Sequence, residues 1–340
     1  MTDLRLFPKI ELHLHLEGAA PPALVRRLGA EQGKDLTGLF DEGGGYAWSD
    51  FTTFLAAYET MSRVFEDPET YADLTEAVLR EQAANGVVYT EIFLSPPSLF
   101  GGDCGRWEAM RAAAEAGADR VPGLACRFIP VVIRHHGPEA ARTGTAAMLK
   151  APRGRIRGFG MAGDERAFHP RDFAGCFAEA REAGLRLTAH AGEFGGPESV
   201  RAALDDLGVE RIGHGVRAIE DASLVARLAA EGVTLEVCPG SNLALGLYPS
   251  LAAHPVARLR EAGCRVTIST DDPPFFRDTM TKEYERLAMT FGWGEGQFAA
   301  LFRTALEAAF CGPETKAAVA RRLDGGAGSL SSAENEGPRT

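Results

Sequence analysis

Short runs rich in Val, Ile and Leu alternate along most of the chain with longer runs rich in Ala, Glu and Arg. This alternation is typical of βα units, whose strands pair in parallel. The predicted strands are residues 9–14, 87–94, 126–133, 155–160, 185–190, 209–213, 233–237 and 264–269. The predicted helices include residues 104–119, 171–184, 197–206, 221–231 and 255–262. Eight such units favour an α/β fold whose strands close into a (β/α)8 TIM barrel.

Length and composition agree with a globular barrel. A chain of 340 residues accommodates one (β/α)8 barrel or two ordinary domains. Hydrophobic residues make up 45% and charged residues 24% of the chain, which are ordinary values for a globular protein. We expect a single domain over residues 1–325. Residues 326–340 are rich in Gly, Ser and Glu without an apolar period, so we expect a disordered tail there.

Charge and cysteine usage narrow the class of protein. The net charge of -11 and the absence of a Lys/Arg run argue against nucleic acid, whose phosphates attract clustered positive charge. No stretch approaches the ~20 apolar residues of a membrane span, so we expect a cytoplasmic protein. The six cysteines form no C-x-x-C pair, which favours reduced thiols. Cys238, near a predicted strand end, is expected to be structural.

The longest insertion, residues 35–86, separates the first two predicted strands and is expected to be helical. Phe51, Phe54, Leu55, Tyr58 and Met61 recur in it at near-helical spacing. Such a stripe usually packs on a core. The alternative is a lid that covers a site and contacts substrate. Independently of that alternative, the predicted pocket lining is Phe51, Phe54, Leu55 and Ser95.

Two histidines, His13 and His15, lie two residues apart in the first predicted strand. Side chains on a strand alternate between faces, so both imidazoles point the same way. Such a pair can bind one metal ion, and zinc favours imidazole nitrogen. The alternative is a partly buried, hydrogen-bonded patch.

The remaining candidate ligands follow other predicted strands. His190 and His214 come at the ends of the fifth and sixth, and Asp271 follows the eighth. Catalytic groups of a (β/α)8 barrel lie at the carboxyl ends of its strands, so these residues are expected to converge. Asp271 and Asp272 precede a proline and alone would predict only a turn. The convergence favours Asp271 as a metal ligand and Asp272 as a substrate contact.

Three imidazoles and one carboxylate around zinc leave room for a water whose pKa the metal lowers toward ~7. His13, His15, His190 and Asp271 supply such a set, although iron, cobalt or manganese can substitute for zinc. Glu193, three residues after His190, is a candidate general acid and base. His214 lies between two glycines, which allow close approach, and is a candidate for orienting the hydroxide.

Four phrases in register resemble the adenosine deaminase family of the amidohydrolase superfamily over residues 7–320. They are PKIELHLHLEG at 8–18, HAGE at 190–193, IGHG at 212–215 and TDDP at 270–273. The resemblance implies one zinc on His13, His15, His190 and Asp271, and hydrolytic deamination at C6 of a 6-aminopurine. It further implies the following catalytic and substrate contacts: Glu193 protonates N1, His214 steers the hydroxide, Asp271 assists catalysis, Asp272 accepts a hydrogen bond from N7, and the Gly163 amide meets N3.

Lysine positions favour a single metal. Two-metal members of the superfamily bridge their ions with a carboxylated lysine on a middle strand. The chain has only Lys9, Lys34, Lys150, Lys282 and Lys316, none of which lies near the fourth predicted strand. The P-C-x-x-C cysteines of cytidine-type deaminases are also missing.

The identity of the purine depends on two further positions. Residues 161–165 (MAGDE) resemble the nucleoside enzymes, whereas the adenine-base enzymes tend to carry a Ser-Ser-Glu-like segment there. This favours adenosine or 2′-deoxyadenosine, with inosine or 2′-deoxyinosine and ammonia as products. Glu17 stands where adenosine enzymes usually have the Asp that meets the ribose 5′ hydroxyl. Adenine and aminodeoxyfutalosine therefore remain alternatives, and the oligomeric state is open.

Two alternative functions from other classes of protein are also considered, a dinucleotide-dependent oxidoreductase and a non-catalytic binding protein. Gly158, Gly160 and Gly163 match the dinucleotide-binding spacing, but the preceding strand is short and charged and the following residues do not open a helix. The other reading is a catalytically silent protein that binds zinc and a purine. Glu193 argues against it, because a non-catalytic zinc site needs no carboxyl three residues after a ligand.

Overall fold

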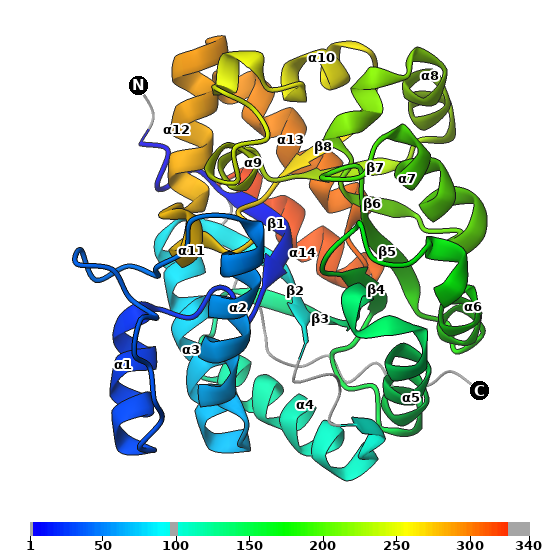
Figure 1. The fold of residues 1–340 in the computed structure, drawn as a ribbon. Helices are drawn as coiled ribbons and strands as arrows, with labels where there is room; N and C mark the ends of the chain where they lie inside the picture. The colour runs from blue at the N-terminus through cyan, green and yellow to red at the C-terminus, as the bar shows by residue number, and fades with distance from the viewer. Residues whose placement is uncertain (1–2, 96–100, 326–340) are drawn as a thin grey trace.

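Eight parallel strands lie in a barrel in the order in which they occur along the chain (Figure 1). The computed structural model describes residues 3–95 and 101–325, so the predicted tail lies outside the described residues. The strands are β1 (Lys9–His15), β2 (Val87–Leu94), β3 (Ala125–Ile133), β4 (Gly158–Ala162), β5 (Arg186–Ala191), β6 (Arg211–His214), β7 (Thr234–Val237) and β8 (Arg265–Ile268). A parallel bridge between Leu14 and Asp271 links the two ends of the sheet. The (β/α)8 barrel is thereby confirmed.

Helices surround the strands (Figure 1). They are α1 (Pro22–Glu31), α2 (Phe51–Ser62), α3 (Pro68–Ala84), α4 (Cys104–Asp119), α5 (Gly137–Lys150), α6 (Ala174–Glu182), α7 (Pro197–Ala202), α8 (Ala222–Glu231), α9 (Pro239–Ala244), α10 (Val256–Glu261), α11 (Pro273–Phe276), α12 (Met280–Phe291), α13 (Glu295–Ala308) and α14 (Pro313–Leu323). Within the described ranges, none of them is both long and apolar enough for a membrane span. The six cysteines are free, as expected.

Strand β4 begins later than the predicted 155–160, so that boundary was wrong. Ile156 makes only an isolated bridge to Phe128 of β3. Arg155 and Arg157 flank it, and Arg155 pairs with Asp119 at the end of α4. Regular pairing with β5 starts at Gly158.

The glycines of β4 serve packing. A Cβ on Gly158 would lie 3.0 Å from the Arg186 carbonyl oxygen, and one on Gly160 would lie 3.0 Å from Val131 Cγ1. Both are inside a strand, whereas a dinucleotide fingerprint needs its glycines in the turn from strand to helix. The structure therefore contradicts the oxidoreductase alternative.

A chain of buried charges crosses the barrel interior beneath the strand ends. Arg211 contacts Glu91 with Nη1 at 2.6 Å and Glu236 with Nε at 2.5 Å. Burial alone would raise the pKa of Glu236, but Arg211 and His13 hold it below its ordinary value. Glu236 in turn contacts His13 Nδ1 at 2.8 Å. The interior is thus built to fix one of the candidate ligands.

Helix α2 lies within the insertion after β1, and both interpretations of its apolar stripe have support. Asp50 caps its first turn through the Thr53 amide. Phe54 and Met61 are buried in the core. Phe51, Phe54, Leu55 and Tyr58 also line the cavity at the barrel mouth. The helix is therefore both a packed element and a wall of the site.

Candidate active site

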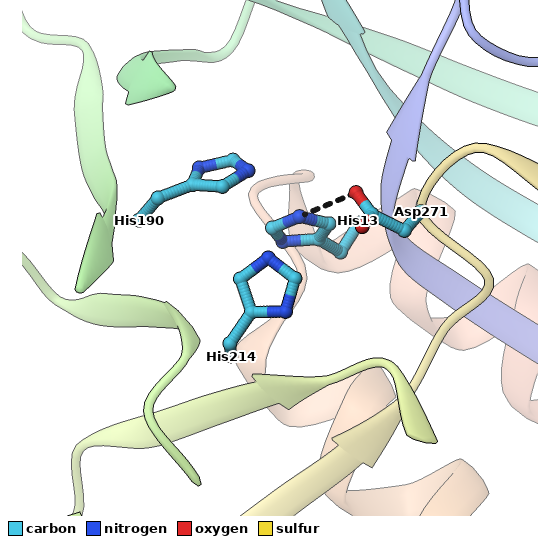
Figure 2. A group of neighbouring side chains, drawn as sticks. All are labelled: His13, His190, His214 and Asp271. Carbon is cyan, nitrogen blue, oxygen red and sulfur yellow. Dashed lines mark ion pairs between the residues drawn. The ribbon is translucent and has the colours of Figure 1, made fainter. Parts of the chain in front are cut away.

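The candidate ligands converge at the carboxyl ends of the strands, as predicted. His13 and His15 come from β1, His190 from β5 and His214 from β6, while Asp271 follows β8. Figure 2 shows His13, His190, His214 and Asp271 around one centre, with ligand atoms within 4.8 Å of one another. His15 Nε2 lies 3.1 Å from His190 Nε2 and 3.2 Å from Asp271 Oδ1. Residues far apart in sequence therefore form one cluster.

Hydrogen bonds behind the cluster orient the imidazoles. His13 Nδ1 faces Glu236, and His190 Nδ1 lies 3.0 Å from the Met161 carbonyl oxygen. These contacts turn Nε2 of both rings toward the centre, which is how zinc-binding histidines are held. Among the described residues, the buried His13 Nε2 meets the Asp271 carboxylate, whose Oδ1 lies 3.3 Å away. An imidazole nitrogen and a carboxylate oxygen that face each other in this way suit a metal ion.

The electrostatics of the cluster also suit a cation. Burial opposes ionisation of Asp271, but hydrogen bonds from His13 and His15 hold its pKa well below the ordinary value. Burial alone would lower the pKa of His13, yet Asp271 and Glu236 raise it to about 9. Burial and the neighbouring imidazoles lower the pKa of His190. These shifts favour an ionised Asp271 carboxylate, a neutral His190 imidazole and a positive charge at His13.

Two residues of the cluster adopt left-handed backbone conformations that non-glycine residues rarely occupy. His214 has φ of 60° and Asp271 has φ of 66°. Such strain persists where the surroundings fix the residue. Gly213 provides room, since a Cβ there would lie 2.8 Å from His13 Cε1. The turns after β6 and β8 therefore aim these two side chains into the mouth.

Glu193 follows His190 in a loop fixed by another carboxylate. The Glu165 side chain accepts from the amides of residues 192–195 at 2.6–2.9 Å. Burial, followed by the charges of Asp271 and Glu165, raises the pKa of Glu193 well above its ordinary value. This shift favours the protonated form that a general acid requires.

An amide connects Glu193 with His214. Asn242, on α9, places Nδ2 3.3 Å from Glu193 Oε1 and 3.4 Å from His214 Nδ1. Its Oδ1 lies 3.1 Å from His254 Nε2. Burial lowers the pKa of His214, and also that of His254, to about 3, so both rings are neutral.

A cavity of about 300 Å³ opens over the cluster. Its walls include most of the predicted substrate contacts, namely Phe51, Phe54, Leu55, Ser95, Gly163 and Asp272. Burial, followed by the charges of Asp271, Glu193 and Glu17, raises the pKa of Asp272. Asp272 Oδ1 has no hydrogen-bond partner in the part of the chain that the structure describes. A protonated carboxyl is thus left free to meet a ligand.

Glu17 is the exception among the predicted contacts, because it lies behind the wall. It is only 1% exposed. Its Oε1 accepts from Tyr71 Oη at 2.7 Å, and its Oε2 accepts from Tyr58 Oη at 3.3 Å and Ser95 Oγ at 3.1 Å. The Ser95 amide also donates to it. The protein itself therefore occupies the hydrogen-bonding capacity of this carboxyl group.

Sequence reasoning missed several residues that build the site. Ser241 donates to Asp271 Oδ2 at 2.7 Å, and Asn242 is its neighbour. Cys238, in the same segment, is buried, and burial followed by the charge of Asp271 raises its pKa well above the ordinary value. Ser241 and Asn242 follow the end of β7, and the rule that located Asp271 could have located them. Glu165 follows the end of β4 in the same way, and Tyr58 belongs to the apolar stripe at residues 51–61.

The rim of the cavity carries a second group of possible ligands, Glu59, His135 and His136. His135 Nδ1 accepts from the Asp164 amide at 3.2 Å, so in the neutral ring the proton is on Nε2. That nitrogen lies 3.7 Å from Glu59 Oε1. The arrangement favours a polar rim over a metal site.

Comparison with known proteins agrees with this geometry. The family model described as Adenosine deaminase matches residues 8–325. The chain belongs to the adenosine deaminase family. Its family makes it a purine deaminase of the amidohydrolase superfamily, a hydrolase that acts on C–N bonds.

Individual members of the adenosine deaminase family resemble the chain over nearly its whole length. A relative from Chelativorans sp. (strain BNC1), named adenine deaminase, is 48% identical over 93% of this chain and 97% of its own. The crystal structure of adenine deaminase from Arthrobacter aurescens superposes with a TM-score of 0.85 at 30% identity, covering 94% of this chain and 98% of that one. An amidohydrolase from Burkholderia ambifaria with bound Zn has a TM-score of 0.81 at 26% identity, covering 94% and 92%.

These names do not confirm the expectation of adenosine and fit the adenine alternative better. The segment 161–165, on which the expectation depended, has a structural explanation. Its Glu165 binds the loop at residues 192–195 and leaves only Ala162 and Gly163 on the cavity wall. The segment therefore fixes the loop that carries Glu193, which explains its sequence without reference to the group attached to a purine.

Proposed function

We propose that this protein is an adenine deaminase that converts adenine and water into hypoxanthine and ammonia. The observation that carries the proposal is the saturated Glu17 carboxyl. The resemblance puts this position beside a ribose 5′ hydroxyl, yet Tyr58, Tyr71 and Ser95 already supply its hydrogen bonds. A cavity of about 300 Å³ is also at the small end of ligand pockets. Both features favour a free base over a nucleoside.

The residues present fit one zinc ion held by His13, His15, His190 and Asp271. Second contacts orient His13 and His190, and the site favours a positive charge. When bound, zinc lowers the pKa of a water molecule so that hydroxide is available near neutral pH. His214 lies beside this set and contacts Glu193 and Asn242, which supports an orienting role.

Glu193 supplies the proton that activates the purine. In its protonated form it can donate to N1, which makes C6 more electrophilic. The oxygen of the water molecule then forms a bond with C6, and one proton of that water is transferred to the leaving amino group. Ammonia departs, and the Glu193 carboxylate takes the remaining hydroxyl proton from the C6 oxygen. Glu193 is thereby restored and the product is the 6-oxo purine.

Asp272 and Gly163 orient the other edges of the base. The raised pKa of Asp272 makes its carboxyl a donor, which suits the unprotonated N7 of 9H-adenine. The expectation that Asp272 accepts from N7 would instead require the 7H tautomer. Gly163 lines the cavity with φ of 96°, and its amide is the proposed donor to N3.

The test is ammonia release by zinc-loaded protein with adenine, adenosine, 2′-deoxyadenosine and aminodeoxyfutalosine in parallel. We expect turnover of adenine, with kcat/KM for adenosine lower by about 100-fold or more, equivalent to ~3 kcal/mol. Faster turnover of a nucleoside would overturn the substrate assignment. Zinc binding without ammonia from any of the four would favour the silent binding protein.

A further inference from the structure

Beside the proposed proton donor lies a buried polar chain that runs from His254 through Asn242 to Glu193 and His214. His254 precedes α10 and is 2% exposed, and Asn242 is fully buried on α9. Neither residue lines the cavity. Any effect on the reaction must therefore pass through the groups that they contact.

The direction of each hydrogen bond follows from one backbone amide. Val256 donates its N–H to His254 Nδ1 at 3.2 Å, so the proton of this neutral ring is on Nε2. Nε2 then donates to Asn242 Oδ1 at 3.1 Å. This fixes which way the Asn242 amide points, and its Nδ2 must face Glu193 and His214.

The same reasoning extends to the two groups at the mouth. An amide Nδ2 only donates, so His214 Nδ1 must accept, and the proton of the neutral ring is on Nε2. Glu193 Oε1 also accepts from Asn242. When Glu193 is protonated, its carboxyl proton is therefore on Oε2, the oxygen left free to donate.

We propose that His254 and Asn242 are positioning residues that fix the tautomer of His214 and place the acid proton of Glu193 on Oε2. The inference deepens the proposed function and rests on it for the roles of Glu193 and His214. In this arrangement His214 offers an Nε2–H to the reacting oxygen. It acts as a hydrogen-bond donor and neither as the base nor as a metal ligand through that nitrogen.

The first test needs no activity. Long-range 1H–15N correlation spectra of the zinc-loaded protein with 15N-labelled histidine distinguish the two neutral tautomers. We expect His214 and His254 to carry the proton on Nε2. In His254→Leu the Asn242 amide is released, and we expect His214 to become a mixture of tautomers. A proton on His214 Nδ1 in the wild type would overturn the inference.

The second test uses kinetics with adenine. His254→Leu and Asn242→Ala should each lower kcat at least tenfold while KM changes less than threefold, because the general acid is misaligned. His254→Gln should recover most of kcat, since its side-chain amide can donate to Asn242 Oδ1. Equal losses in the Gln and Leu variants would mean that His254 only fills space, and would overturn the inference.

A matched control separates positioning from folding. Asn85 is also buried, but it ends α3 and bonds to Glu81, away from the mouth. Asn85→Ala should lower stability with little change in kcat. A loss of kcat as large as in Asn242→Ala would overturn the positioning role. If wild-type protein releases no ammonia from adenine, the proposed function fails, whereas the tautomer spectra still decide the inference.

Discussion

The cavity has two unlike ends. One, here the histidine end, comprises His13, His15, His190, His214, Asp271, Glu193 and Asp272. The other, here the closed end, comprises Tyr58 and Ser95 of the cavity wall together with Glu17 and Tyr71 behind it. At the histidine end, a buried polar atom, Asp272 Oδ1, has no hydrogen bond among the described residues. At the closed end, the carboxyl group already accepts from three side chains.

The difference suggests a division of roles, in which the histidine end carries out the reaction and the closed end selects the substrate. Unsatisfied buried polar groups cost free energy, so they persist where a ligand satisfies them. The Glu17 carboxyl already has its hydrogen bonds within the protein, so a ligand would add no favourable contact to it. Four experiments test whether the two ends behave differently.

The sharpest test of the histidine end is Glu193→Gln. The amide keeps the shape but cannot supply the acid proton, so kcat with adenine should fall by roughly 10²-fold or more. Zinc content by mass spectrometry should remain that of the wild type. Retained activity would remove Glu193 from the reaction.

Glu11, next to the histidine end, is a further buried carboxyl group with a raised pKa. Glu11 Oε1 accepts from the Thr270 amide, its Oε2 is unpartnered among the described residues, and burial raises its pKa to about 7. The folded state then binds more protons than the unfolded state between the ordinary pKa and about 7. Stability contributed by this group is present at low pH and is lost as the pH rises through that window.

Glu11→Gln provides the measurement for that pH dependence. Urea unfolding of both proteins at matched free zinc should show the wild type losing about 1–3 kcal/mol relative to the variant between pH ~5 and ~7. Parallel pH curves would contradict a raised pKa at Glu11.

At the closed end, Tyr71→Phe should destabilise the fold. The variant removes the 2.7 Å hydrogen bond to Glu17 Oε1 and leaves a buried acceptor with weaker partners, at a cost of about 2 kcal/mol. Tyr46→Phe is the matched control, because its buried hydroxyl donates to a neutral carbonyl, that of Ala20. It should cost about 1 kcal/mol in the same urea assay. Equal costs would argue against a special carboxyl at position 17.

The smallest effect is expected on selectivity. Tyr58→Ala removes the ring that separates the cavity from Glu17, so kcat/KM for adenosine relative to adenine should rise about tenfold. Tyr58→Phe keeps the volume and should change this ratio less. An unchanged ratio in the alanine variant would show that Tyr58 does not exclude the ribose.

The sequence predicted which residues meet at the histidine end, because their placement depends on local rules. His13 and His190 lie near the carboxyl ends of β1 and β5, His214 ends β6, and Asp271 follows β8. The carboxyl ends of barrel strands meet at one mouth. The same rules locate the strands to within a few residues, with β4 as the poorest case. Its shift reflects Arg155 and Arg157, whose partners are not visible in the local pattern.

The closed end could not be predicted in the same way. Glu17 is saturated by Tyr71 of α3 and Ser95 after β2, and nothing near it in sequence indicates these partners. Likewise, the orientation of the Asn242 amide depends on a hydrogen bond from His254, which lies in the loop before α10. Substrate preference and proton placement depend on such contacts, whereas the metal-binding residues depend on strand ends.

The buried charges that cross the barrel have a consequence for protein engineering. His13 is oriented by Glu236, which is held by Arg211, which is paired with Glu91. Transplanting the histidines and the aspartate alone into another barrel would therefore leave His13 without the support that sets its direction. A transplanted centre must therefore include the buried charged residues on β2, β6 and β7 that support His13 of β1, together with the ligands.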